Sequence, residues 1–232
     1  MGSFVFSLDL GQVNDFTALS LVERVPPAPY PPGTQPMVTR DIGAGMTRTQ
    51  PAPDTRKPDY HIRGLERVPL GTSYVAIVAL VKQRMASSPL FRGAPLLIDR
   101  TGVGRAVFDL FTEARLAPWG ITFTGGREAT RAGRDLHVPK TDLTSALIAV
   151  YQGERLKIAA DLVEGPTLIE ELMNFRPKVN LATGNESFEA WRESVHDDLV
   201  LSVAMAIWFA EQARPPQEAI AGPPRPPINF RQ

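Results

Sequence analysis

The chain has 232 residues, a length that suits one large domain or two small ones and by itself favours one. It contains no cysteine, which excludes disulfides, thiolate metal sites and cysteine nucleophiles. Its formal net charge is zero, so a polyanionic partner has to be bound by local positive charge, and no apolar stretch reaches the roughly 20 residues that a membrane span requires.

The first part of the chain predicts antiparallel strands interrupted by an insertion. Residues 4–9 form a short apolar pattern, and residues 16–22 form a second one after a turn, which is typical of a hairpin. Residues 25–58 hold nine of the 22 prolines, so we expect a long surface loop there, because proline suits neither a helix interior nor a central strand. Residues 60–68 resume a strand pattern, expected to pair with the hairpin.

The rest of the chain predicts strands alternating with helices. Strand patterns cover 95–99, 120–124 and 156–159, helical patterns cover 73–85, 104–116, 140–152, 167–174 and 196–213, and a hairpin is expected over 175–191. We expect residues 72 or 73 to cap the first helix and residues 141 or 142 the third. The prediction is one α/β domain, residues 1–213, with a mixed sheet of antiparallel hairpin strands and parallel strands flanked by helices, the 25–58 insertion, and a proline-rich tail over 214–232.

Acidic residues end two of the predicted strands and open the last predicted helix. These are Asp9, Asp99 and the pair Asp197 and Asp198. Sites in open α/β sheets lie beyond the strand ends, so we expect these carboxylates to converge at one rim of the sheet. Such a cluster suits phosphodiester cleavage with two divalent cations ~3.5–4 Å apart, and oxygen ligands favour Mg²⁺ or Mn²⁺. A turn or helix-capping role explains each acid equally simply, so the pattern leaves the role of each one open.

Five short segments resemble motifs of the nuclease domain of phage terminase large subunits, a member of the ribonuclease-H-like superfamily. Residues 9–23 resemble its first acidic motif, residues 98–104 its second, in which an acid precedes a Thr-Gly-x-Gly turn, and residues 196–200 its third. Two further segments, 138–143 and 170–175, are also similar. The match spans about residues 4–210, nearly the whole chain.

The resemblance implies a ribonuclease-H-like fold and a metal-dependent DNA endonuclease. It implies that Asp9, Asp99 and Asp197 are catalytic and hold two Mg²⁺ or Mn²⁺ ions, with Asp198 as an additional ligand. The implied partners are double-stranded DNA and an ATPase motor domain or other packaging proteins, since the chain has no G-x-x-x-x-G-K-[ST] loop. The start of the chain lacks a signal-peptide pattern, so we expect a cytoplasmic protein, in the bacterial host if the chain is of phage origin.

Two basic segments are candidates for DNA contacts. Residues 125–140 predict a flexible basic loop suited to phosphate, although a solvated loop explains it equally well. The hairpin expected over 175–191 resembles a DNA-facing hairpin of the terminase family. The candidate side chains are Arg127, Arg131, Arg134, Lys140, Arg176 and Lys178.

Other functional classes remain open at the level of sequence. A Holliday-junction resolvase would share the acids and the metals but act on branched DNA. An actin-like or sugar-kinase-like phosphotransferase also combines a strand-ending Asp with Gly, as in residues 9–11, but needs two such domains and a longer chain. A non-catalytic DNA-binding or assembly module would not need all of the acids.

Overall fold

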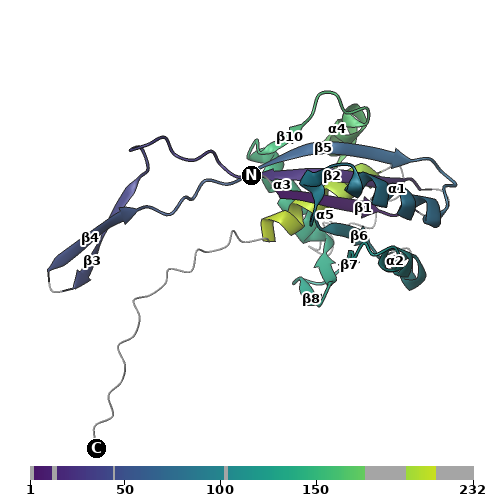
Figure 1. Ribbon diagram of the computed structural model, residues 1–232, viewed down its shortest axis with the longest axis horizontal. Coiled ribbons are helices and arrows are strands. Elements are labelled where there is room, and N and C mark those ends of the chain that lie inside the picture. Colours follow the sequence, from purple (N-terminus) through teal and green to yellow (C-terminus); the bar gives the residue numbers. More distant parts are fainter. Residues whose placement is uncertain (1–2, 12–14, 44, 102–103, 176–196, 213–232) are drawn as a thin grey trace, which may run out of the picture.

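The computed structural model describes residues 3–11, 15–43, 45–101, 104–175 and 197–212. These residues form an eight-stranded mixed sheet, a separate two-stranded sheet and helices on both faces of the larger sheet (Figure 1). None of the helices in these ranges combines the length and the apolar character needed to cross a lipid bilayer.

The large sheet has the strand order β10-β5-β2-β1-β6-β7-β9-β8. In this sheet β2 pairs antiparallel with both β1 and β5, whereas β6, β7 and β9 run parallel to β1. The C-terminal ends of these four parallel strands therefore lie at one rim of the sheet, called here the carboxylate rim. The strands are β1 (Ser3–Asp9), β2 (Thr17–Val25), β5 (Asp59–Val68), β6 (Leu96–Asp99), β7 (Trp119–Thr124), β8 (Thr130–Ala132), β9 (Asp135–Pro139) and β10 (Leu156–Ile158).

Helices cover the two faces of the sheet and enclose two hydrophobic cores. One core lies under α1 (Tyr74–Ala86), α2 (Gly104–Glu113) and the short 3-10 helix η1 (Pro89–Phe91). The other lies among α3 (Lys140–Gln152), α4 (Gly165–Asn174) and α5 (Asp198–Gln212). Successive side chains of a strand point to opposite faces, which is why Val5 belongs to the α5 core while Phe6 and Leu8 belong to the α1–α2 core.

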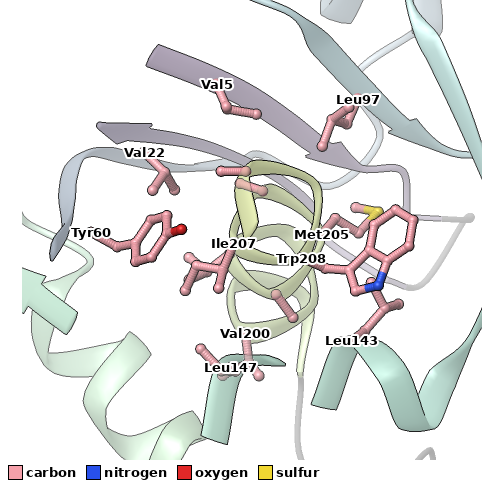
Figure 2. Close-up of a cluster of buried hydrophobic side chains, with 14 of the residues drawn as sticks. Val5, Val22, Tyr60, Leu97, Leu143, Leu147, Val200, Met205, Ile207 and Trp208 are labelled. Carbon is pink, nitrogen blue, oxygen red and sulfur yellow. The ribbon is translucent and has the colours of Figure 1, made fainter. Parts of the chain in front are cut away.

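Helix α5 is the centre of the larger core. Eleven of its fifteen residues are buried, as expected for a helix that is apolar on all sides. Figure 2 shows α5 between the strands that carry Val5, Val22 and Leu97 and the side chains Leu143 and Leu147 of α3. This packing fixes where α5 begins, which determines the position of the acids at its N-terminus.

The expected order of elements is confirmed where the structure describes it, with two local corrections and a third in the insertion, described below. The segment over residues 125–140, predicted to be a flexible loop, contains the antiparallel pair β8–β9. Helix α3 has Pro139 at its N-cap and no capping side chain, so residues 141 and 142 lie inside the helix instead of capping it. The first helix is capped as expected, since the Ser73 side chain accepts a hydrogen bond from the backbone of Ala76. The hairpin expected over 175–191, with Arg176 and Lys178, and the tail over 214–232 lie outside the described residues.

The insertion between β2 and β5 forms an arm, defined here as residues 26–58. It holds two strands that the sequence did not predict, β3 (Met37–Gly43) and β4 (Met46–Pro51), paired antiparallel. The prolines that argued against strands flank this hairpin, apart from Pro51, the last residue of β4. Figure 1 shows the hairpin standing apart from the large sheet.

Candidate active site

Two of the predicted acids lie side by side at the carboxylate rim. The parallel register pairs Leu8 with Ile98, so Asp9 and Asp99 are the next residues along two adjacent strands. Both point to the α5 face, because Val5 and Leu97, at even spacing from them, belong to the α5 core. Their side chains are only 7% and 8% exposed and lie within hydrogen-bonding reach of each other.

The N-terminus of α5 brings in the other two acids. The backbone carbonyl of Asp197 accepts the first hydrogen bond of the helix, from Leu201 at 2.9 Å, so Asp197 stands just before the first turn. Asp198 is the first residue of the helix and is buried. Burial raises the pKa of Asp9 well above its ordinary value, and the charges of Asp99, Asp198 and Asp197 raise it further. All four predicted acids are therefore close enough to interact electrostatically.

A fifth acid, Glu171 of α4, lies behind this cluster. Its Oε2 accepts a hydrogen bond of 2.8 Å from the backbone N–H of Val200, in the first turn of α5. Its other oxygen forms an ion pair with Arg67 at the end of β5. Burial raises the pKa of Glu171 to about 7, and the charges of Asp198 and Asp197 act in the same direction. The hydrogen bond from Val200 and the charge of Arg67 oppose this rise in the pKa. Through these two contacts Glu171 connects α4, β5 and the start of α5.

The loops that carry Asp9 and Asp99 are held by short backbone contacts. The backbone N–H of Thr101 donates to Oδ1 of Asp99 at 2.8 Å, and the Thr101 hydroxyl accepts from the backbone of Phe123 at 2.9 Å. After β1, the N–H of Gly11 donates to the Thr17 hydroxyl at 3.1 Å. A β-carbon on Gly11 would lie 2.1 Å from the carbonyl oxygen of Asp15, so only glycine fits there.

The chemistry of these side chains suits a hard divalent cation. Carboxylate oxygens are the preferred ligands of Mg²⁺ and Mn²⁺, and a cation would relieve the repulsion that raises the pKa of Asp9. Among the described residues, however, no three His, Cys, Asp or Glu side chains are already arranged to hold one ion. Asp9 and Asp99 instead lie close to each other, and this proximity adds to the rise in the pKa of Asp9 that burial causes. A bound cation would favour the ionised form of both carboxyl groups.

The described basic candidates divide between the two ends of the sheet. Lys140 follows the last residue of β9 and Arg127 follows β7, so both lie at the carboxylate rim. Arg131 and Arg134 cover the ring of Trp119, at 4.6 Å and 5.2 Å from its centroid. Trp119 is the first residue of β7, so these two arginines lie at the opposite end of that strand. Of these four side chains, only Lys140 and Arg127 lie at the same end of the sheet as the acids.

Sequence reasoning did not single out Glu171, Arg67 or Thr101 as parts of this site. A signal existed for Glu171, because it lies three residues after the buried Leu168 and hence on the core-facing side of α4. An acid at such a position needs a charged or hydrogen-bonding partner. Arg67 and Thr101 carry no comparable signal, since their contacts come from residues distant in the sequence.

The comparisons with known proteins identify the fold. The chain is similar to the large terminase nuclease from thermophilic phage G20c, with a TM-score of 0.52 and 20% sequence identity over 88% of this chain and 81% of that one. A weaker similarity, with a TM-score of 0.47 and 13% identity over 90% of this chain and 83% of the other, links it to the human cytomegalovirus terminase nuclease domain in a Mn-soaked structure. No family model and no curated protein sequence matches the chain. The fold is ribonuclease-H-like, as expected.

Proposed function

We propose that this chain is a metal-dependent endonuclease that hydrolyses the phosphodiester bonds of double-stranded DNA. The observation that carries the proposal is the meeting of Asp9, Asp99 and Asp198, with Asp197 beside them, at one rim of a ribonuclease-H-like sheet. Buried carboxylates repel one another, so a structure that gathers three of them beside a fourth, half-buried one gains most when divalent cations bind among them. The similarity to the G20c large terminase nuclease supports the same class of reaction.

In this mechanism Asp9, Asp99 and Asp197 would hold two Mg²⁺ or Mn²⁺ ions, and Asp198 would be a further ligand. Two ions in such a site activate the attacking water and neutralise charge on the leaving oxygen. Burial and the neighbouring carboxylates raise the pKa of Asp9, and ionised carboxyl groups are the form that would hold the cations. Glu171 holds the first turn of α5, and with it Asp197 and Asp198, against the sheet through Val200. Lys140 and Arg127 at the same rim would bind the DNA phosphates.

The test is digestion of a closed-circular plasmid with Mg²⁺, with Mn²⁺ and with EDTA. Cleavage should need a divalent cation, and Asp99→Asn should lower its rate at least ~10³-fold, because it removes a metal ligand. Asp109→Asn is the matched control, since Asp109 is an exposed acid of α2 on the other face of the sheet. Unchanged cutting by the Asp99 variant would falsify the assignment of the site.

Metal binding can be measured apart from cleavage. Calorimetric titration with Mn²⁺ should give two ions per chain, and Asp9→Asn should reduce both the number and the affinity. Far-ultraviolet circular dichroism verifies that each variant is folded.

Two alternatives predict different substrates or none. A Holliday-junction resolvase would cut a four-way junction in preference to a linear duplex of the same length, so both substrates belong in the assay. A non-catalytic DNA-binding or assembly module would bind DNA without cutting it under any metal condition. The proposal also includes a motor domain or other packaging proteins as partners, which co-purification with candidate ATPases would test.

A further inference from the structure

The arm between β2 and β5 is a surface that the proposed cleavage reaction does not use. Its strands are exposed on both faces, and three of its apolar side chains, Met37, Ile42 and Met46, are more than half exposed. A two-stranded hairpin that packs against neither a third strand nor a helix is only marginally stable in water. An arm of this kind is therefore expected to have a partner.

The arm is basic within a chain of zero net charge. It holds four basic and two acidic residues, a net charge of +2. Both acids are engaged within the arm itself. Asp54 is ion-paired with Arg56 at 2.7 Å, and Oδ1 of Asp41 accepts a hydrogen bond from the backbone of Gly43 at 2.8 Å. Apart from the Asp54–Arg56 pair, the arm carries Lys57 and two arginines of the hairpin against the single negative charge of Asp41.

Arg40 and Arg48 are direct cross-strand partners on that hairpin. Side chains of directly paired residues share one face of the ribbon, with β-carbons ~4.5–5.5 Å apart, and like charges placed this way destabilise a hairpin. Both arginines are exposed, and neither forms a hydrogen bond or an ion pair with a described residue. An anion bound by both guanidinium groups would turn this repulsion into a stabilising contact.

The legs of the arm hold the hairpin at a defined distance from the sheet. The Arg56 side chain, in the returning leg, donates to the carbonyl of Ala28 at 2.8 Å and stacks on the ring of Tyr30 in the outgoing leg. At the base, Arg155 donates to the carbonyl of Pro58 at 2.9 Å. Proline-rich legs that are fastened in this way act as a semi-rigid spacer.

We propose that the arm is a second DNA-binding element, in which Arg40 and Arg48 contact the sugar-phosphate backbone of a duplex. This rests on the proposed function, which makes DNA the substrate. A two-stranded ribbon fits the major groove of B-DNA, and phosphate contacts by arginine position a protein without reading sequence. The partner is thus the DNA away from the cleavage point.

The topology sets how far away that contact lies. β2 begins at the carboxylate rim with Thr17 and reaches the base of the arm at Val25, so the sheet separates the two by about 30 Å. The leg of eleven residues, 26–36, adds at most about 35 Å. At about 3.4 Å per base pair, the arm meets DNA roughly 10–20 base pairs from the bond being cut.

The experiment compares an 8-base-pair duplex, about 27 Å long and too short to join the two sites, with a 60-base-pair duplex. Binding is measured in EDTA over a range of salt concentrations, so no cleavage is needed. In Arg40→Gln/Arg48→Gln, affinity for the long duplex should fall roughly tenfold and the salt dependence should lose a slope of about 2, because two phosphate contacts are lost. Cleavage of the short duplex should stay at the wild-type rate.

Lys82→Gln/Arg92→Gln is the matched control, because it removes two exposed charges from the body of the protein. A second variant replaces residues 37–51 with a Gly-Ser linker and should reproduce the loss, even if the glutamine variant altered the hairpin. Wild-type affinity of both arm variants for the long duplex would overturn the proposal and leave a protein as the partner of the arm. If binding of the long duplex depended on the arm but no metal condition gave cleavage, the arm would be a DNA-binding element and the proposed nuclease function would be contradicted.

Discussion

The backbone N–H of Val200 donates a 2.8 Å hydrogen bond to the buried carboxylate of Glu171. Val200 lies in the first turn of α5, where backbone N–H groups have no partner within the helix, and Glu171 supplies one from α4. The same turn begins with Asp198. Glu171 therefore determines where one of the proposed metal ligands lies, while it also adds negative charge behind the site.

Protonation of Glu171 should make stability depend on pH. Its pKa is about 7 in the folded protein and 4.5 in an unfolded chain, so the folded state holds this proton more tightly. Stability from this group is fully present below pH 4.5 and is lost as pH rises to about 7, by roughly 3 kcal/mol in all. Glu171→Gln, which imitates the protonated form, should remove this share of the pH dependence in urea denaturation with EDTA present, and should leave the share due to Asp9, whose pKa is also raised.

Glu170→Gln serves as the control for this prediction, because Glu170 is the exposed neighbour on the same helix. Its denaturation curves should keep the wild-type pH dependence. A Glu171→Gln variant that loses stability between pH 5 and 7 as steeply as the wild type would show that another group is responsible.

The sequence predicted the carboxylate rim because strand ends and parallel order are local signals. Asp9 and Asp99 end apolar strand patterns, and a parallel sheet brings such ends together. The role of Glu171 depends on how α4 packs against α5, which no local pattern encodes. The strands of the arm were missed because the prolines around them masked a hairpin whose cross-strand pairs include Thr39 with Thr49. The sequence did not predict that Arg131 and Arg134 lie at the other end of the sheet from Lys140, because β8 is short and lies at the edge of the sheet.

Two buried serines beneath α5 provide a test of its packing. Ser7 and Ser20 are direct partners on β1 and β2, both are fully buried, and neither hydroxyl has a hydrogen-bond partner among the described residues. A buried hydroxyl without a partner is destabilising, so Ser20→Ala should raise the free energy of unfolding by about 1 kcal/mol. Ser20→Val should instead lower it by about 1–3 kcal/mol by crowding α5. The exposed Ser145→Ala is the control, and a destabilised Ser20→Ala would indicate a hydrogen bond that the hydroxyl does make.

Gly11 should be irreplaceable for the placement of Asp9. An added β-carbon would meet the carbonyl oxygens of Asp15 and Phe16 at 2.1 Å and 2.5 Å, and both belong to the backbone. Gly11→Ala should therefore lower the free energy of unfolding by about 2 kcal/mol and reduce DNA cleavage, since the turn shifts next to Asp9. Gly125→Ala, where nothing lies within 4 Å of the added carbon, should leave both unchanged. Equal effects of the two substitutions on stability would count against this close contact.

The last prediction separates the two groups of basic residues. Lys140 lies at the carboxylate rim, whereas Arg134 donates to the carbonyl of Ala117 and covers Trp119 at the other end of β7. Lys140→Ala should weaken binding of an 8-base-pair duplex in EDTA several-fold and lower the salt slope by about 1, because one phosphate contact is lost. Arg134→Ala should leave that binding unchanged but reduce stability by about 1 kcal/mol, through the lost hydrogen bond and the lost contact with Trp119. Short-duplex binding that depends on Arg134 and not on Lys140 would place the DNA at the opposite end of the sheet from the acids, and would separate DNA binding from the proposed catalytic site.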